Sequence, residues 1–228
     1  KRLTLCETGS RNYWSLISMT HHKHQKFAVF VSGAGTNLQA IIDAVKKEEI
    51  KAELALVFSN NRKALALKRA EEAGLKILAL DRKDYATPQS YERDIVIYLR
   101  EHDIDFIVLA GYMKILSPYF IKEFPNKILN VHPSLLPAFK GANGIKDTFT
   151  YGTKLGGVTI HFVDDKMDHG PIIMQESVKI ADKETLESFT EKIHAIEHRI
   201  YPKAVALFAE GRLKIKGRRV EVIDKVGH

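Results

Sequence analysis

The sequence predicts an α/β fold: an open, mostly parallel twisted sheet with helices on both faces and an antiparallel addition in the C-terminal half. Two observations predict it. Between residues 27 and 131, short continuous apolar runs alternate with segments of helical spacing, a pattern typical of parallel strands covered on both faces. After residue 155 this alternation gives way to two extended segments, one long amphipathic segment and a terminal hairpin pattern.

The elements of the N-terminal half follow in order. Five apolar runs predict strands, at 27–31, 54–58, 77–80, 105–110 and 128–131. Three segments predict helices, at 36–47, 63–73 and 88–101. Gly74 is the stop signal of the second helix, and Tyr91, Ile95 and Leu99 form the apolar stripe of the third.

The C-terminal half has a different pattern. Residues 157–163 alternate between apolar and polar side chains, and residues 172–180 are extended. Residues 186–207 predict one long amphipathic helix, and residues 213–222 predict a hairpin around Gly217. This half therefore adds an antiparallel part to the sheet.

Composition favours an ordinary globular protein of 228 residues, with 45% apolar and 28% charged residues. No apolar run approaches the roughly 20 residues that span a bilayer, so we expect no membrane association. The net charge is +7, but residues 1–26 carry +4 of it, and the remainder has 30 basic and 27 acidic side chains. This near balance disfavours nucleic acid as a partner. The single cysteine, Cys6, excludes an internal disulfide framework and indicates a cytoplasmic protein.

The first 25 residues differ from the rest and are interpreted as a leader or flexible N-terminal segment. Residues 26–228 are predicted to form a single domain. We found no internal repeat and no low-complexity linker in it.

The loop after the first predicted strand favours a bound phosphate. It contains Gly33, Gly35, Thr36 and Asn37, small and polar residues at a helix N-terminus, where backbone N–H groups bind anions. The dinucleotide fingerprint fails because position 38 is leucine, and no Walker A pattern occurs, so NAD and ATP are disfavoured. The alternative is a tight turn with Thr36 as the helix N-cap.

A polar pair ends the fifth predicted strand. Asn130 and His132 are two residues apart, so both side chains face the same side, and Pro133 and Pro137 stiffen the loop that follows. An amide and an imidazole together suit a developing oxyanion, which one holds while the other polarises it or moves a proton. The alternative is a capped strand end with a satisfied histidine.

A third group lies between His161 and Pro171. It contains three carboxylates and two histidines, which leaves a metal site open, although the spacing matches no standard zinc pattern. Asp168 is instead expected to orient His132 or raise its pKa through the opposite charge. Asp164 and Asp165 are equally compatible with a solvated turn.

At these residues the sequence resembles the phosphoribosylglycinamide formyltransferases of the folate-dependent formyltransferase family. The resemblance runs from about Lys26 to Leu213. It is carried by SGAGTNLQAIID at 32–43, VFSNN at 57–61, LAGYMKILSP at 109–118, NVHPSLLPAFKG at 130–141, HFVDDKMDHGPII at 161–173 and EHRIYP at 197–202. It implies a Rossmann-like formyltransferase fold, with a phosphate site in the N-terminal half and a folate site to which the C-terminal half contributes.

The resemblance also implies an activity: transfer of a formyl group from 10-formyltetrahydrofolate to the amine of glycinamide ribonucleotide in purine synthesis, without a metal. It implies that the protein is a monomer or a homodimer. The implied catalytic residues are Asn130, His132 and Asp168. The implied substrate-binding residues are Gly33, Gly35, Thr36, Asn37, Met113 and Glu197, and the implied folate-binding residues are Ile115, Leu116, Val163, Asp165 and Met167.

The sequence departs from the family pattern at Pro88, where some relatives have an arginine near the folate glutamate tail, and at His194, where a glutamine is expected. The sequence leaves four alternative functions. Formyltetrahydrofolate hydrolases and methionyl-tRNA formyltransferases share Asn-x-His…Asp, but they are expected to carry an extra N-terminal or C-terminal domain. A non-catalytic folate- or nucleotide-binding module has no need of a proton shuttle. A metal-dependent hydrolase is the last alternative.

Overall fold

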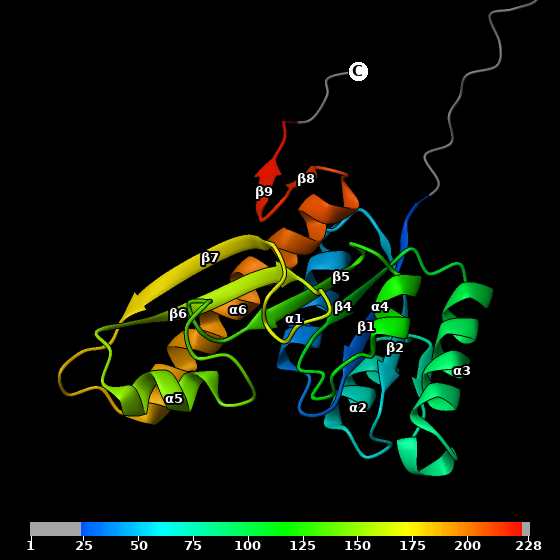
Figure 1. Ribbon diagram of the computed structural model, residues 1–228, viewed down its shortest axis with the longest axis horizontal. Helices are drawn as coiled ribbons and strands as arrows, with labels where there is room; N and C mark the ends of the chain where they lie inside the picture. Colours follow the sequence, from blue (N-terminus) through cyan, green and yellow to red (C-terminus); the bar gives the residue numbers. More distant parts are fainter. Residues whose placement is uncertain (1–23, 225–228) are drawn as a thin grey trace, which may run out of the picture.

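The structure, a computed structural model, describes residues 24–224 and contains one mixed sheet (Figure 1). Its strand order is β3-β2-β1-β4-β5-β6-β7-β9-β8. The strands are β1 (Lys26–Val31), β2 (Glu53–Ser59), β3 (Ile77–Ala79), β4 (Phe106–Leu109), β5 (Ile128–His132), β6 (Leu155–Phe162), β7 (Ile172–Lys179), β8 (Leu213–Lys216) and β9 (Arg219–Val222). The predicted α/β class is confirmed, because β1 to β5 are parallel while β6 and β7 add antiparallel pairs.

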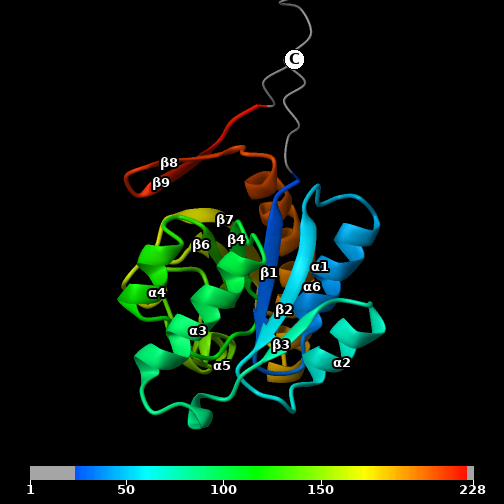
Figure 2. The same ribbon diagram turned by 90° about the vertical axis from the view of Figure 1, so that its right-hand side faces the viewer.

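Helices cover both faces of the sheet. They are α1 (Thr36–Lys46), α2 (Leu65–Glu72), α3 (Pro88–Glu101), α4 (Pro118–Glu123), α5 (Gly144–Tyr151) and α6 (Leu186–Ala209), with a 3₁₀ turn at Arg82–Asp84. Seen along the sheet, α1, α2 and α6 lie on one side and α3 and α4 on the other (Figure 2).

The core consists of two apolar layers, one on each face, because successive side chains of a strand point to opposite faces. In β1, Phe27 and Val29 join the layer under α1, α2 and α6, while Ala28 and Phe30 join the layer under α3 and α4. Both layers are fully buried at β1. This explains why the strand shows a continuous apolar run rather than an alternation.

One strand is more buried than its alternating pattern indicates, and the alternative given for the first loop is wrong about the helix cap. The alternation at 157–163 is typical of a strand with one exposed face, yet β6 is buried from Gly156 to Phe162, since it lies between β5 and β7 and packs against α5 and α6. Thr36 is not an N-cap: Gly35 caps α1 in the left-handed conformation, and no side chain bonds to the helix start.

Other elements follow the predictions closely, including α3 at its predicted residues and the hairpin of β8 and β9 around Gly217. The short helices α4 and α5 were not predicted. Within residues 24–224, no helix has the length and apolar character that crossing a membrane requires. The predicted leader lies outside the described residues, apart from its last two.

Candidate active site

A cavity of about 600 Å³ lies at the carboxyl ends of β1, β4 and β5. Ligands bind at this edge in open α/β sheets, because the loops that follow the strands diverge there. Loops from residues 33–37, 109–116 and 163–168 line it, together with the end of β5 and one face of α6. All residues singled out in the sequence as catalytic, substrate-binding or folate-binding lie on its wall: Gly33, Gly35, Thr36, Asn37, Met113, Ile115, Leu116, Asn130, His132, Val163, Asp165, Met167, Asp168 and Glu197.

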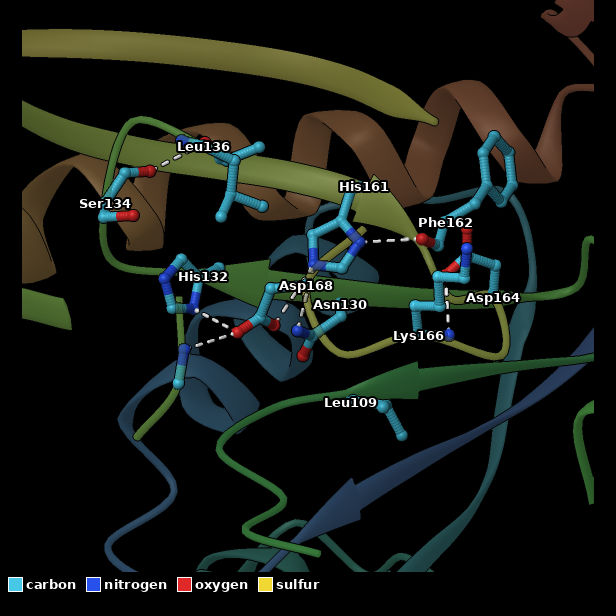
Figure 3. A network of polar contacts seen from close by, with 12 residues as sticks. Leu109, Asn130, His132, Ser134, Leu136, His161, Phe162, Asp164, Lys166 and Asp168 are labelled. Carbon is cyan, nitrogen blue, oxygen red and sulfur yellow. Dashed lines mark hydrogen bonds and ion pairs between the residues drawn. The ribbon is translucent and has the colours of Figure 1, made fainter. Parts of the chain in front are cut away.

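Asn130, His132 and Asp168 lie close together (Figure 3), and all three line the cavity. Nδ1 of His132 lies 3.5 Å from Oδ2 of Asp168. The other ring nitrogen, Nε2, donates to the carbonyl oxygen of Phe139 at 2.8 Å. Both ring nitrogens therefore face acceptors, and a proton on Nδ1 would lie between the ring and the carboxylate.

Backbone contacts hold Asp168 beside His132. Its Oδ2 accepts a hydrogen bond of 2.7 Å from the backbone N–H of Gly141, on the loop that follows β5. Asp168 itself has φ of 48°, a left-handed conformation that costs free energy for a residue with a side chain. The same turn requires glycine at position 170, because a Cβ on Gly170 would lie 1.8 Å from the carbonyl oxygen of Phe162. The turn thus directs this carboxylate toward the imidazole.

His161, which from the sequence was only a possible metal ligand, is a further functional candidate. It pairs with Asn130 across β5 and β6 and is buried. Its Nδ1 donates to the carbonyl oxygen of Phe162 at 2.7 Å, and burial lowers its pKa despite that bond and the nearby Asp168. The neutral ring then has a free Nε2, which accepts from Nδ2 of Asn130 at 3.2 Å. His161 therefore determines which way the Asn130 amide faces.

The loop at one end of the cavity is suited to an anion. Gly35 has φ of 74°, and a Cβ there would lie 2.6 Å from that of Ala66, so only glycine lets α2 pack this close. Arg69 of α2 donates through Nε to the carbonyl oxygen of Ala34 at 3.0 Å. Since no side chain caps α1, the first N–H groups of the helix remain available to a ligand.

Asn37 and Glu197 form a buried polar pair beside this loop. Nδ2 of Asn37 donates to Oε2 of Glu197 at 2.9 Å, while Oδ1 of Asn37 is buried without a hydrogen-bond partner. Burial raises the pKa of Glu197 to about 7, although the bond from Asn37 opposes the rise. His194, one turn earlier on α6, also lines the cavity, and burial lowers its pKa. The unpaired acceptor and the carboxylate are suited to ligand hydroxyl groups.

The other end of the cavity has an apolar rim. Met113, Ile115 and Met167 line the cavity yet are each more than half exposed. The 110–117 loop is held from two sides: the Ser32 hydroxyl accepts from the N–H of Met113, and the carboxylate of Glu92 accepts from both the N–H and the hydroxyl of Ser117. A rim of exposed apolar side chains on a fixed loop suits a flat aromatic ligand.

The metal alternative has no geometric support in residues 24–224, where no group of three or more His, Cys, Asp or Glu side chains is arranged to hold an ion. The histidines at 161 and 169 are instead bonded to a backbone carbonyl and to Asp164.

Comparison with known proteins gives a consistent result. Residues 25–205 match the family described as formyl transferase. The chain is 39% identical over 181 residues to phosphoribosylglycinamide formyltransferase of Bacillus subtilis, which covers 79% of this chain and 93% of that one. It also matches trifunctional purine biosynthetic proteins adenosine-3, but it spans only 14% of the one from Chironomus tentans and 19% of the one from Gallus gallus.

Solved structures agree. Glycinamide ribonucleotide transformylase 1 from Symbiobacterium toebii superposes with a TM-score of 0.85 at 42% identity, covering 88% of this chain and 95% of that one. A formyltetrahydrofolate deformylase from Pseudomonas syringae superposes with a TM-score of 0.81 at 23% identity, covering 89% of this chain and 67% of that one. The second likeness concerns the fold alone.

Proposed function

The chain belongs to the formyl transferase family, and from this premise we propose that it transfers a formyl group from 10-formyltetrahydrofolate to the primary amine of glycinamide ribonucleotide in purine biosynthesis. One observation carries the proposal. Asn130, His132 and Asp168 meet in a cavity that has an uncapped helix start at one end and an apolar rim at the other. A phosphorylated amine and a folate therefore have separate ends to occupy.

Each end of the cavity suits one of the two substrates. The phosphate accepts hydrogen bonds from the backbone of residues 33–37, and the ribose hydroxyls bond to Glu197 and the free Oδ1 of Asn37. The folate ring packs against Ile115, Leu116 and Val163, with Asp165 and Met167 on the opposite loop. Met113, whose N–H bonds to the Ser32 hydroxyl next to the anion loop, contacts the ribonucleotide. The amine and the formyl carbon then meet beside Asn130.

Asn130 and His132 stabilise the charge that develops when the amine nitrogen attacks the formyl carbon. As the new C–N bond forms, the carbonyl oxygen becomes an oxyanion, which accepts from Nδ2 of Asn130. We infer that the oxyanion also replaces the Phe139 carbonyl as the acceptor of the proton on Nε2 of His132. Substrate binding is therefore expected to displace the loop that carries Phe139.

Asp168 and His132 take part in the proton transfers of the reaction. The attacking amine must lose a proton, and the departing nitrogen of the folate must gain one as its bond to the formyl carbon breaks. Asp168 lies 3.5 Å from the imidazole and on the cavity wall, so it can accept the first proton while holding the ring. No metal takes part in this proposal, and the expected cytoplasmic location remains a prediction.

Hydrolysis of the formyl folate is the second candidate, since a deformylase shares the fold. The anion site favours transfer instead, because water as acceptor needs neither an uncapped helix start nor the Asn37–Glu197 pair. The deciding experiment uses 10-formyl-5,8-dideazafolate with and without glycinamide ribonucleotide, followed by absorbance. Loss of the formyl group only when the amine is present is expected. Equal loss without it would make the protein a hydrolase, and binding without loss would make it a non-catalytic module.

The anion site can be tested at Gly33, where an added Cβ meets no atom within 4 Å. Gly33→Asp is expected to raise the KM for the ribonucleotide roughly tenfold or more, because a carboxylate would face the phosphate, while the KM for the folate changes little. Gly33→Ala is the control, since it adds the same Cβ without charge. Equal weakening of both substrates by Gly33→Asp would contradict the assignment of this loop to the phosphate.

A further inference from the structure

The hairpin of β8 and β9 has little strand pairing with the rest of the sheet, although Leu213, Ile215 and Val220 pack against the core. Its strands pair with each other from Leu213 with Val222 to Lys216 with Arg219. Within residues 24–224, Arg219 alone is registered against the neighbouring strand, opposite Ile172 at the start of β7. The hairpin crosses above the end of the sheet, with its turn directed toward the start of β7 (Figure 1). Its turn therefore lies next to the 163–171 loop, which joins β6 to β7.

The turn of the hairpin presents an arginine to this loop. Gly217, with φ of 59°, allows the tight turn, and Arg218 follows it. Nη1 of Arg218 lies 3.2 Å from Nδ1 and 3.3 Å from Nε2 of His169. Nδ1 of His169 in turn lies 2.6 Å from Oδ2 of Asp164. Since a carboxylate only accepts, the proton on Nδ1 belongs to that bond, and Nε2 is left to accept from Arg218.

Asp164 links His169 to the cavity wall. Its other oxygen, Oδ1, accepts a hydrogen bond of 3.1 Å from the backbone N–H of Lys166, which closes the turn at 164–166. Asp164, Asp165, Lys166 and Met167 all line the cavity, whereas His169 does not. The series from Arg218 through His169 to Asp164 thus runs from the hairpin to the part of the loop that faces a ligand.

We propose that Arg218 is a positioning residue: from the C-terminal hairpin, and through His169 and Asp164, it holds the 164–167 segment in the conformation that binds the formyl donor. The ligand class rests on the proposed function. The contact is exposed, so its free energy is modest. Val163 and Asp168 are held by Ile128 and Gly141, whereas Asp165, Lys166 and Met167 between them are exposed and depend more on this contact. Loss of the contact should widen the range of loop conformations and weaken donor binding rather than chemistry.

The test compares Arg218→Ala with Arg219→Ala, which removes the same charge from the same hairpin one residue further on. Arg218→Ala is expected to raise the KM for the formyl donor two- to fivefold, with kcat and the KM for the amine within twofold of wild type. Arg219→Ala is expected to leave all three unchanged, and Arg218→Lys to recover part of the donor KM. Equal effects of the two alanine variants would overturn the proposal, since charge alone would then account for them.

The route through His169 is tested by a double-mutant cycle. His169→Ala should raise the donor KM as Arg218→Ala does, and the double variant should be no weaker than the worse single variant, because both remove one connected contact. Additive effects would show that Arg218 acts by another route and would overturn the proposal.

Hydrogen exchange of the free protein gives a readout that needs no activity. Amides of residues 164–167 should exchange faster in Arg218→Ala than in Arg219→Ala or wild type. Faster exchange in a protein that transfers no formyl group would retain the positioning role and reject the proposed function. Normal transfer with unchanged exchange and donor KM would reject the positioning role alone.

Discussion

Replacing His132 by alanine is expected to lower kcat by roughly 100- to 10,000-fold, the usual range for the loss of a group that moves a proton in the transition state. The imidazole lies between the carboxylate of Asp168 and the carbonyl of Phe139, on the wall of the cavity. Because the lost interactions form in the transition state, kcat and kcat/KM should fall together, with little change in KM. Steady-state kinetics with both substrates checks this.

The structural cost of the same substitution needs a matched control. Removing His132 leaves the Phe139 carbonyl without its donor. Ser134→Ala removes a comparable donor to the same loop, since the Ser134 hydroxyl bonds to the carbonyl oxygen of Ala138 at 2.6 Å, but Ser134 does not line the cavity. Ser134→Ala should lose stability with nearly normal turnover. Comparable turnover losses in the two variants would mean that His132 acts by supporting the loop.

Replacing Glu197 by glutamine is expected to stabilise the fold at alkaline pH while weakening the ribonucleotide. Burial raises the pKa of Glu197 from 4.5 to about 7. A carboxyl with a raised pKa in the folded state contributes full stability below pH 4.5, and that contribution is lost as pH rises through 7. At pH 8 the ionised side chain therefore costs on the order of 3 kcal/mol, which glutamine avoids while still accepting from Asn37.

The measurement is the free energy of unfolding of wild type and Glu197→Gln at pH 5 and pH 8. The stability difference should be small at pH 5 and grow toward pH 8, and the KM for the ribonucleotide should rise because an ionised acceptor for its hydroxyls is gone. Glu191→Gln, on an exposed part of the same helix, is the control and should show no such difference. A difference that does not change with pH would mean that Glu197 carries no buried charge.

The sequence was informative where a feature depends on neighbouring residues. The i, i+2 spacing in β5 correctly indicated that Asn130 and His132 share a side, and Gly217 correctly indicated the hairpin. The position of α3 followed from its apolar stripe, and the structure begins the helix with a capping box of Thr87 and Ser90 and with Pro88 in the first turn. Such signals survive in a single sequence because the responsible contacts span only a few residues.

Other features depend on residues far apart in the chain. His161 comes to lie against Asn130 only through the antiparallel register of β5 and β6, across 31 residues. The buried face of β6, which its alternating pattern did not predict, exists because α5 and α6 pack on it. The pairing of the hairpin turn with His169 joins residues 49 positions apart. No local pattern encodes these distances.

The sequence by itself determined the order along the chain of the strands and of helices α1, α2, α3 and α6, the polar groups that end β5, and the small residues before α1, because backbone preference and apolar periodicity are local. The tertiary structure decided the chemistry of the site. Burial raises the pKa of Glu197 and lowers that of His161, and the folded loops bring the Phe139 carbonyl and Asp168 to opposite nitrogens of His132. Desolvation and the direction of a hydrogen bond arise only when distant segments pack together, so they can be read only from the folded chain.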